Sequence, residues 1–225
     1  MAITANVPAV TRRFVFTSVG LAAGFSGLAM LTYILTPVSL LAAELLFAAG
    51  AAVWVVFLAR RAPASLLREV GRVVVVGASV GAVSTIVYDV TRTLLSLLDP
   101  SPYDPFEAIR MFGRGVLPGT AGPGLVLGVG LVIHLVNGST FGVIYAIFAR
   151  GRLGTVRSAL GSGMAWGVVL ELIQSILYPG WLGIRAVLAE FLVISGAGHL
   201  VYGATLGFGV RRLLVEEPGH PTPGR

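Results

Sequence analysis

Two histidines with the same sequence around them are the residues of this chain best suited to chemistry. The pattern His-Leu-Val-x-Gly-x-Thr-x-Gly occurs at 134–142 and again at 199–207. In a helix, the histidine and the two glycines of each copy fall on one face, at positions i, i+4 and i+8. An imidazole can bind a metal or exchange a proton near neutral pH. The glycines leave room beside it for a ligand or for another helix.

Other polar side chains in the apolar sequence could complete a site with these histidines. Asp89 and Arg92 stand three residues apart, as do Glu171 and Gln174, so each pair shares a helix face. Asp89 and Arg92 could neutralise each other as a local ion pair, or they could contact a substrate. The candidate ligand or proton site therefore comprises His134, Asn137, Glu171, Gln174, His199, Tyr202, Asp89 and Arg92.

The sequence leaves three interpretations of the two histidines. They could ligate haem b or a metal ion, since both lie near the middle of apolar segments that run in the same direction. They could instead bind or pass a small polar ligand, ion or proton together with Glu171. The third interpretation is structural, with each histidine hydrogen-bonded across a glycine-lined helix contact. Among functional roles we favour the second, which is not enzymatic. A redox protein or enzyme with haem or metal on His134 and His199 is the alternative.

The composition places these residues in a lipid bilayer. The chain has 225 residues, of which 56% are hydrophobic and only 12% are charged, too apolar for one soluble core. One crossing needs about 20 apolar residues. The sequence therefore predicts an all-α bundle of six transmembrane helices, at residues 14–35, 38–60, 73–98, 121–149, 155–178 and 183–211.

The arginines predict the orientation of this bundle. With the N-terminus inside, twelve arginines lie on the cytoplasmic side and three lie outside, as the positive-inside rule requires. Both termini are then cytoplasmic, in the cytoplasmic membrane, and the first span is a retained signal anchor. The net charge of +6 follows from this topology and gives no reason to expect nucleic acid as a partner.

Two missing residue types restrict the chemistry. The chain has no cysteine and no lysine. Without cysteine it forms no disulfide, thiolate metal site or iron–sulfur cluster. Without lysine it can bind neither pyridoxal phosphate nor retinal as a Schiff base.

The predicted organisation has four parts. Residues 1–60 form a transmembrane hairpin, 61–72 a basic cytoplasmic linker, 73–212 the functional four-helix unit, and 213–225 a disordered tail whose His220 is no site candidate. Within the unit, Asp104-Pro-Phe-Glu107 predicts the start of an external interfacial helix near 105–112, with Asp104 as the cap and Glu107 as its capping-box partner. That helix could be a lid over a cavity, although we favour a connector on the membrane surface.

The repeated histidine pattern predicts a parallel internal repeat, which pairs spans three and four with spans five and six. The glycine faces 77/81, 138/142 and 203/207 could instead pack against other chains. In that case the protein would be an accessory or scaffolding subunit of a membrane complex, or a homo-oligomer.

Three short runs carry a family resemblance: Asp89-x-x-Arg92, Phe106-Glu-Ala-Ile-Arg-Met-Phe-Gly113, and His199-Leu-Val-Tyr-Gly203 with Gly207. Through them, residues 73–212 resemble an uncharacterised family of small four-helix integral membrane proteins from archaea and bacteria, a domain of unknown function. The resemblance implies a four-helix unit in a membrane and no particular activity. The first two spans are an addition to that pattern.

Overall fold

Almost all of the described chain is helical. The structure, a computed structural model, describes residues 7–101 and 103–215. Its elements are α1 (Ala9–Ala23), α2 (Phe25–Leu35), α3 (Leu40–Arg61), α4 (Ala64–Leu98), α5 (Glu107–Val116), α6 (Pro123–Ala149), the 3-10 turn η1 (Arg150–Arg152), α7 (Val156–Trp181), the 3-10 turn η2 (Arg185–Val187) and α8 (Leu188–Leu214). The predicted tail from residue 216 onward, with His220, lies outside the described residues.

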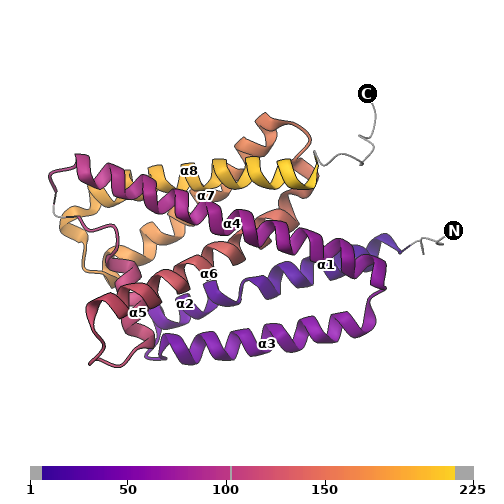
Figure 1. The fold of residues 1–225 in the computed structure, drawn as a ribbon, viewed down its shortest axis with the longest axis horizontal. Helices are drawn as coiled ribbons and strands as arrows, with labels where there is room; N and C mark the ends of the chain where they lie inside the picture. Colours follow the sequence, from indigo (N-terminus) through magenta and orange to yellow (C-terminus); the bar gives the residue numbers. More distant parts are fainter. Residues whose placement is uncertain (1–6, 102, 216–225) are drawn as a thin grey trace.

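Six segments are long and apolar enough to cross a membrane: Ala9–Leu35, Leu40–Arg61, Ala64–Leu98, Pro123–Arg152, Val156–Trp181 and Arg185–Leu214. The start of α1 and the end of α8 lie at the same end of the elongated bundle, on the right of Figure 1, as an even number of crossings requires. The all-α helix bundle of a multi-pass membrane protein is therefore confirmed.

The first and third spans differ most from the prediction. The first span is broken at Gly24, whose N–H donates to the carbonyl of Leu21, so that α1 and α2 are separate helices. The third span begins at Ala64 rather than at residue 73, directly after Pro63. Most of the predicted linker is therefore helical. Its Glu69 forms an ion pair with Arg12 of α1, which holds these first turns of α4 against the first span.

Glycine contacts bring the last four spans together in two close pairs. A Cβ atom built on Gly81 of α4 would lie 2.5 Å from the carbonyl oxygen of Gly138 in α6. One built on Gly163 of α7 would lie 2.0 Å from the carbonyl oxygen of Gly203 in α8. Small residues permit such backbone approach between membrane helices. The glycine faces are thus used inside this chain, and they no longer favour an accessory subunit.

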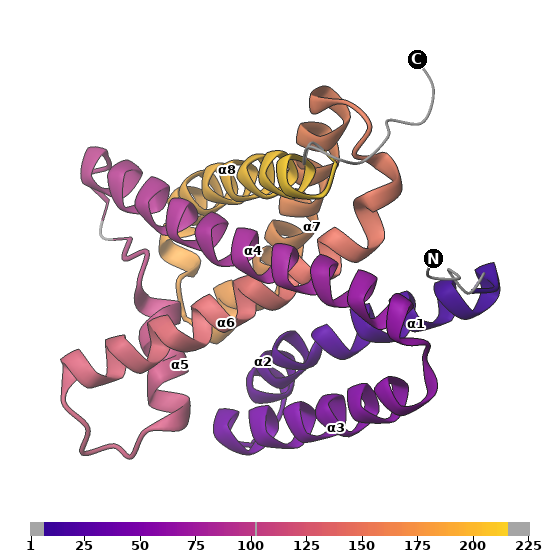
Figure 2. The same cartoon turned by 45° about the vertical axis from the view of Figure 1, so that its right-hand side comes forward.

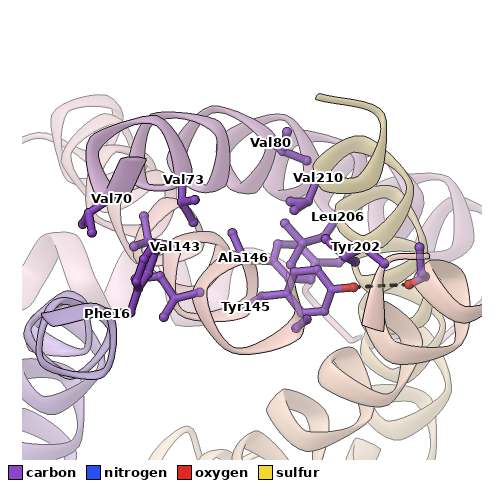
Figure 3. Packing of buried hydrophobic residues seen from close by; sticks show 14 of the residues in the cluster. Phe16, Val70, Val73, Val80, Val143, Tyr145, Ala146, Tyr202, Leu206 and Val210 are labelled. Atoms are coloured by element: carbon purple, nitrogen blue, oxygen red, sulfur yellow. Dashed lines mark hydrogen bonds between the residues drawn. The ribbon is translucent and has the colours of Figure 1, made fainter. Parts of the chain in front are cut away.

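The largest apolar core fills the space between these helices. Figure 2 shows α4 passing across both α6 and α8. Figure 3 shows side chains of α1, α4, α6 and α8 meeting there, among them Phe16, Val80, Tyr145 and Leu206. The site described below lies farther along the same helices, toward α5.

The short helix α5 is a packed part of the protein. It runs across α6 (Figures 1 and 2), and its Ile109 and Phe112 are each 1% exposed. Its start differs from the prediction: Phe106 is the N-cap, and Asp104 accepts from the Phe106 N–H at 2.8 Å. Glu107 pairs with Arg110 and Arg114 and does not complete a capping box, because two guanidinium groups compete for its carboxylate.

Candidate functional site

Helices α7 and α8 form the more fully bonded half of the site. His199 Nδ1 lies 2.8 Å from Glu171 Oε2, and Ser195 Oγ donates to the same oxygen at 2.8 Å. Gln174 Nε2 lies 3.3 Å from His199 Nε2. An amide nitrogen only donates, so in this arrangement His199 Nε2 accepts and Nδ1 donates to Glu171. Glu171 and Gln174 thus share a helix face, as predicted, and together hold one tautomer of a ring that is 4% exposed.

Helices α4 and α6 form a second pair of the same kind. His134 Nε2 and Asp89 Oδ1 lie 3.2 Å apart. The two groups are not aligned for a hydrogen bond, and both atoms lack a hydrogen-bond partner among residues 7–101 and 103–215. Asp89 also borders a groove of about 470 Å³ on the other side of α4 and α6. The α4–α6 half of the site therefore has fewer of its polar atoms hydrogen-bonded than the α7–α8 half.

The two pairs occupy corresponding places. Asp89 comes eight residues after Gly81 and Glu171 eight residues after Gly163, the glycines at which the two helix pairs cross. His134 and His199 each come four residues before a glycine, Gly138 and Gly203, whose carbonyl oxygen lies at the crossing of its helix pair. The two pairs are thus arranged as expected for the parallel repeat.

Tyr88 of α4 connects the two halves. Its ring centroid lies 4.6 Å from that of His199 and 5.8 Å from that of His134. Its hydroxyl lies 3.4 Å from Ser195 Oγ and accepts from Arg92 Nη1 at 2.8 Å. The ring can approach α8 because Gly198 stands there, where a built Cβ would lie 2.8 Å from the Tyr88 ring.

Arg92 differs from the sequence-based expectation. Among the described residues it forms no ion pair with Asp89. Its guanidinium lies over the Tyr88 ring, 4.6 Å from the centroid, while Asp89 is directed to His134. Arg92 is 5% exposed, and its Nε and Nη2 have no hydrogen-bond partner within the part of the chain that the structure describes.

Tyr103, in the loop that leads to α5, lies beside this end of the site. Burial raises the pKa of its phenol above the ordinary value, and the positive charge of Arg92 offsets part of this shift. The phenol therefore stays neutral at physiological pH and supplies no counter-charge to the guanidinium.

A cavity of about 30 Å³ lies where the two halves meet, with room for about two water molecules. Five of the predicted site residues line it, and the other three contact its lining: the lining residues are Thr85, Tyr88, His134, Asn137, Gly138, Phe141, Leu170, Gln174, Tyr178, His199 and Tyr202. Asn137 Oδ1 is a buried acceptor with no partner among the described side chains and backbone. The Tyr202 hydroxyl instead donates to the carbonyl oxygen of Gly138 at 3.0 Å and joins α8 to α6.

Sequence reasoning missed Tyr88 and Ser195. A tyrosine in an apolar run is common in membrane helices, so its type alone gave no signal. The spacing did carry one: Tyr88 stands four residues before Arg92, and Ser195 four before His199, which places each on the face of a predicted site residue.

The two histidines do not fit a haem. A cavity of about 30 Å³ is far smaller than a porphyrin, and Tyr88 packs near both rings. For a metal ion, each pair supplies one imidazole and one carboxylate. No group of three or more metal-ligating His, Cys, Asp or Glu side chains occurs in the described ranges, whereas protein metal sites usually provide three or four ligands.

The fold and the site define a multi-pass helical membrane protein with two partly buried carboxylate–histidine pairs around one small polar cavity. No family model, no curated protein and no solved structure matches the chain.

Proposed function

We propose that this protein binds a small polar ligand at the cavity between the two carboxylate–histidine pairs. We place it in the cytoplasmic membrane with both termini in the cytoplasm, because of its arginine distribution. The polar cavity is lined by residues of the predicted four-helix unit 73–212, for which we retain the proposed resemblance to small four-helix membrane proteins.

The observation that carries this proposal is the set of unpartnered polar atoms around one cavity. Asn137 Oδ1 and His134 Nε2 belong to residues that line it, and Asp89 Oδ1 lies beside His134; each is buried without a hydrogen-bond partner in the described structure. One buried unsatisfied group costs about 1–3 kcal/mol. A structural network is expected to satisfy its members, and a cavity of about 30 Å³ admits water or one polar group of a ligand. We infer that such a group completes the hydrogen bonding of this set.

The same atoms indicate the chemistry of the ligand. Asn137 Oδ1 and Asp89 Oδ1 are acceptors, so a hydroxyl or ammonium hydrogen would satisfy them. The Glu171–His199 pair already has Ser195 and Gln174 as hydrogen-bond partners, so we do not expect it to be the first contact of the ligand. The ligand is therefore expected to contact the α4–α6 half first.

Histidine nitrogen NMR can test this proposal because the chain has three histidines. The protein, labelled with ¹⁵N-histidine and reconstituted in nanodiscs, would be titrated separately with glycerol, ethanolammonium and acetate. Each probe can place one polar group in a cavity that holds about two water molecules. We expect saturable shifts of the His134 ring signals with glycerol or ethanolammonium, and none with acetate. His134→Gln and His199→Gln variants assign the signals.

The matched control is Glu190→Gln, which removes another acidic residue of α8. Glu190 stands nine residues before His199, on the other side of the helix, and it should leave the titration unchanged. Asp89→Asn should weaken the shift at least several-fold. Absence of a saturable shift with all three probes would overturn the proposal.

A chain of hydrogen-bonding groups favours a second candidate function, proton relay. It runs from Tyr88 through Ser195 to Glu171 and His199, with contacts of 2.8 Å to 3.4 Å. Arg92 donates to the Tyr88 hydroxyl at the start of this chain but is not a member of it, because its guanidinium keeps its proton. Such chains can move protons when their members exchange donor and acceptor roles. In proteoliposomes with an internal pH dye, relay predicts proton flux that Glu171→Gln abolishes and Glu190→Gln preserves. Flux equal to that of empty vesicles would exclude it.

A further inference from the structure

A deep apolar groove lies next to the polar cavity. It has a volume of about 330 Å³ and is formed by α1 and α2 on one side and by α6 and α7 on the other. Its lining is mainly aliphatic and aromatic, with Leu28, Ile144 and Ile173 as typical members, and it contains no charged side chain. Pockets of this volume are large enough for a small organic ligand.

The groove and the cavity lie side by side and share wall residues. Asn137, Gln174 and Tyr178 line both, as do Phe141 and Leu170. Asn137 is 6% exposed, and its Oδ1 is buried without a hydrogen-bond partner among the described residues. A molecule in the groove can therefore place one polar group against Asn137 while its remainder stays among apolar side chains.

Glycines of the first span let aromatic side chains of α6 pack closely against it along the groove. Gly20, Gly24 and Gly27 all line the groove, and Gly24 also breaks the helix. A Cβ at Gly27 would lie 3.0 Å from the Phe141 ring. The first span is thus one wall of the groove. The functional region extends beyond residues 73–212, to which the sequence analysis confined it.

The groove lining favours a neutral amphiphile. A carboxylate or phosphate head group would find no counter-charge among the groove residues, and the carboxylate of Asp89, which could attract an ammonium group, lines neither this groove nor the cavity. A hydroxyl can hydrogen-bond to the Asn137 amide. From Gly20 to Ile34 the groove follows about 21 Å of helix at 1.5 Å per residue, a large part of the hydrocarbon thickness of a bilayer, about 30 Å. That length suits one extended hydrocarbon chain.

We propose that the ligand of this protein is a neutral single-chain lipid with a hydroxyl head, whose chain lies in the groove and whose hydroxyl reaches Asn137. The inference rests on the proposed function, since it names the class of ligand that enters the polar cavity. Burial of the chain adds little specificity inside a membrane, because lipid tails are as apolar as the groove. Recognition therefore depends on the hydroxyl.

Photo-crosslinking tests this inference. The protein would be reconstituted in phosphatidylcholine vesicles that contain a long-chain primary alcohol with a diazirine in its chain, and the labelled residues would be mapped by mass spectrometry. We expect saturable labelling of the groove, centred on Phe141, Ile144 and Ile173, that unlabelled alcohol displaces. A diazirine fatty acid and a diazirine phosphatidylglycerol should give no saturable label there.

Two substitutions in α7 form a matched pair. Ile173→Trp fills the groove and should reduce labelling at least tenfold. Ile176→Trp should leave it unchanged, since Ile176 is 80% exposed and does not line the groove. Asn137→Leu preserves the approximate shape but removes the acceptor, and it should weaken labelling by about tenfold. Gel filtration of each variant separates lost binding from lost folding.

The outcomes distinguish this inference from the proposed function. Glycerol-induced shifts at His134 without saturable groove labelling would overturn the lipid inference and leave the polar site standing. Labelling that persists undiminished in Asn137→Leu would also overturn it, because the hydroxyl would then not reach the polar site. Equal labelling by the charged probes would contradict the neutral head group.

Discussion

At the scale of single residues, the site depends on one saturated carboxylate. Glu171 accepts from Ser175 and Ser195 and lies 2.8 Å from His199 Nδ1. Hydrogen bonds to charged groups contribute about 1.5–3 kcal/mol each. We therefore expect Glu171→Gln to lower the free energy of unfolding by about 2–3 kcal/mol, measured by reversible unfolding in mild detergent. Glu190→Gln is the control, with an expected change within about 0.5 kcal/mol. Equal effects of the two variants would contradict the assigned role of Glu171.

Tyr88 and Arg92 provide a second residue-scale prediction, because their contact is buried. Tyr88→Phe removes the acceptor of Arg92 Nη1 and leaves the guanidinium, which still lies over the ring, with no hydrogen-bond partner in the described site. We expect a loss of about 1–3 kcal/mol of stability. Tyr88→Phe combined with Arg92→Met should cost less than the sum of the single changes, since both polar partners are then absent. Strict additivity in this double-mutant cycle would show that the contact is not energetically coupled.

At the scale of helices, glycine contacts position both halves of the site. Gly163→Ala would place a methyl group 2.0 Å from the carbonyl oxygen of Gly203 and would separate α7 from α8. Overpacking of this kind costs about 1–3 kcal/mol, and it should also lengthen the Glu171–His199 contact. Gly161→Ala in the same helix is the control, since a Cβ there meets nothing within 4 Å. Thermal unfolding of the two variants checks this prediction, and equal midpoints would contradict it.

Hydropathy was the signal from which the helices could be predicted, and it succeeded only in part. Hydropathy located the six spans, because burial in lipid requires long apolar runs. It did not show the break at Gly24, since a glycine within an apolar run is tolerated in membrane helices. It also placed the start of the third span too late. Residues 64–72 are helical although they include three charged side chains, and hydropathy does not detect helical turns that continue beyond the lipid.

Most residues of the candidate site could be predicted from the sequence, but their contacts with one another could be predicted only in part. Helix-face spacing grouped Glu171 with Gln174 correctly and suggested Asp89 with Arg92, yet Asp89 contacts His134 of another helix. Which helices touch is decided by tertiary packing, and sequence spacing within one helix cannot reveal it. The groove was not foreseen for the same reason, since α1 and α2 come from the part of the chain predicted to be a packing hairpin.

At the scale of the whole molecule, the orientation in the membrane is the main testable prediction. The chain has no cysteine, so single cysteines can report sidedness without background. In intact cells, a membrane-impermeant maleimide should label Gly119→Cys in the loop before α6. It should label Gly154→Cys, between α6 and α7, only after permeabilisation. Both positions are exposed. The reverse pattern would show that the protein is inserted with its termini outside.

The two carboxylate–histidine pairs around Tyr88 are the central claim of this account, and histidine ¹⁵N NMR of the ligand-free protein tests them most directly. Glu171→Gln should change the ring signals of His199 only, Asp89→Asn those of His134 only, and Tyr88→Leu those of both. Wild-type His199 should show its proton on Nδ1. Signals of His199 that are unaffected by Glu171→Gln, or a proton found on Nε2, would contradict the site as described.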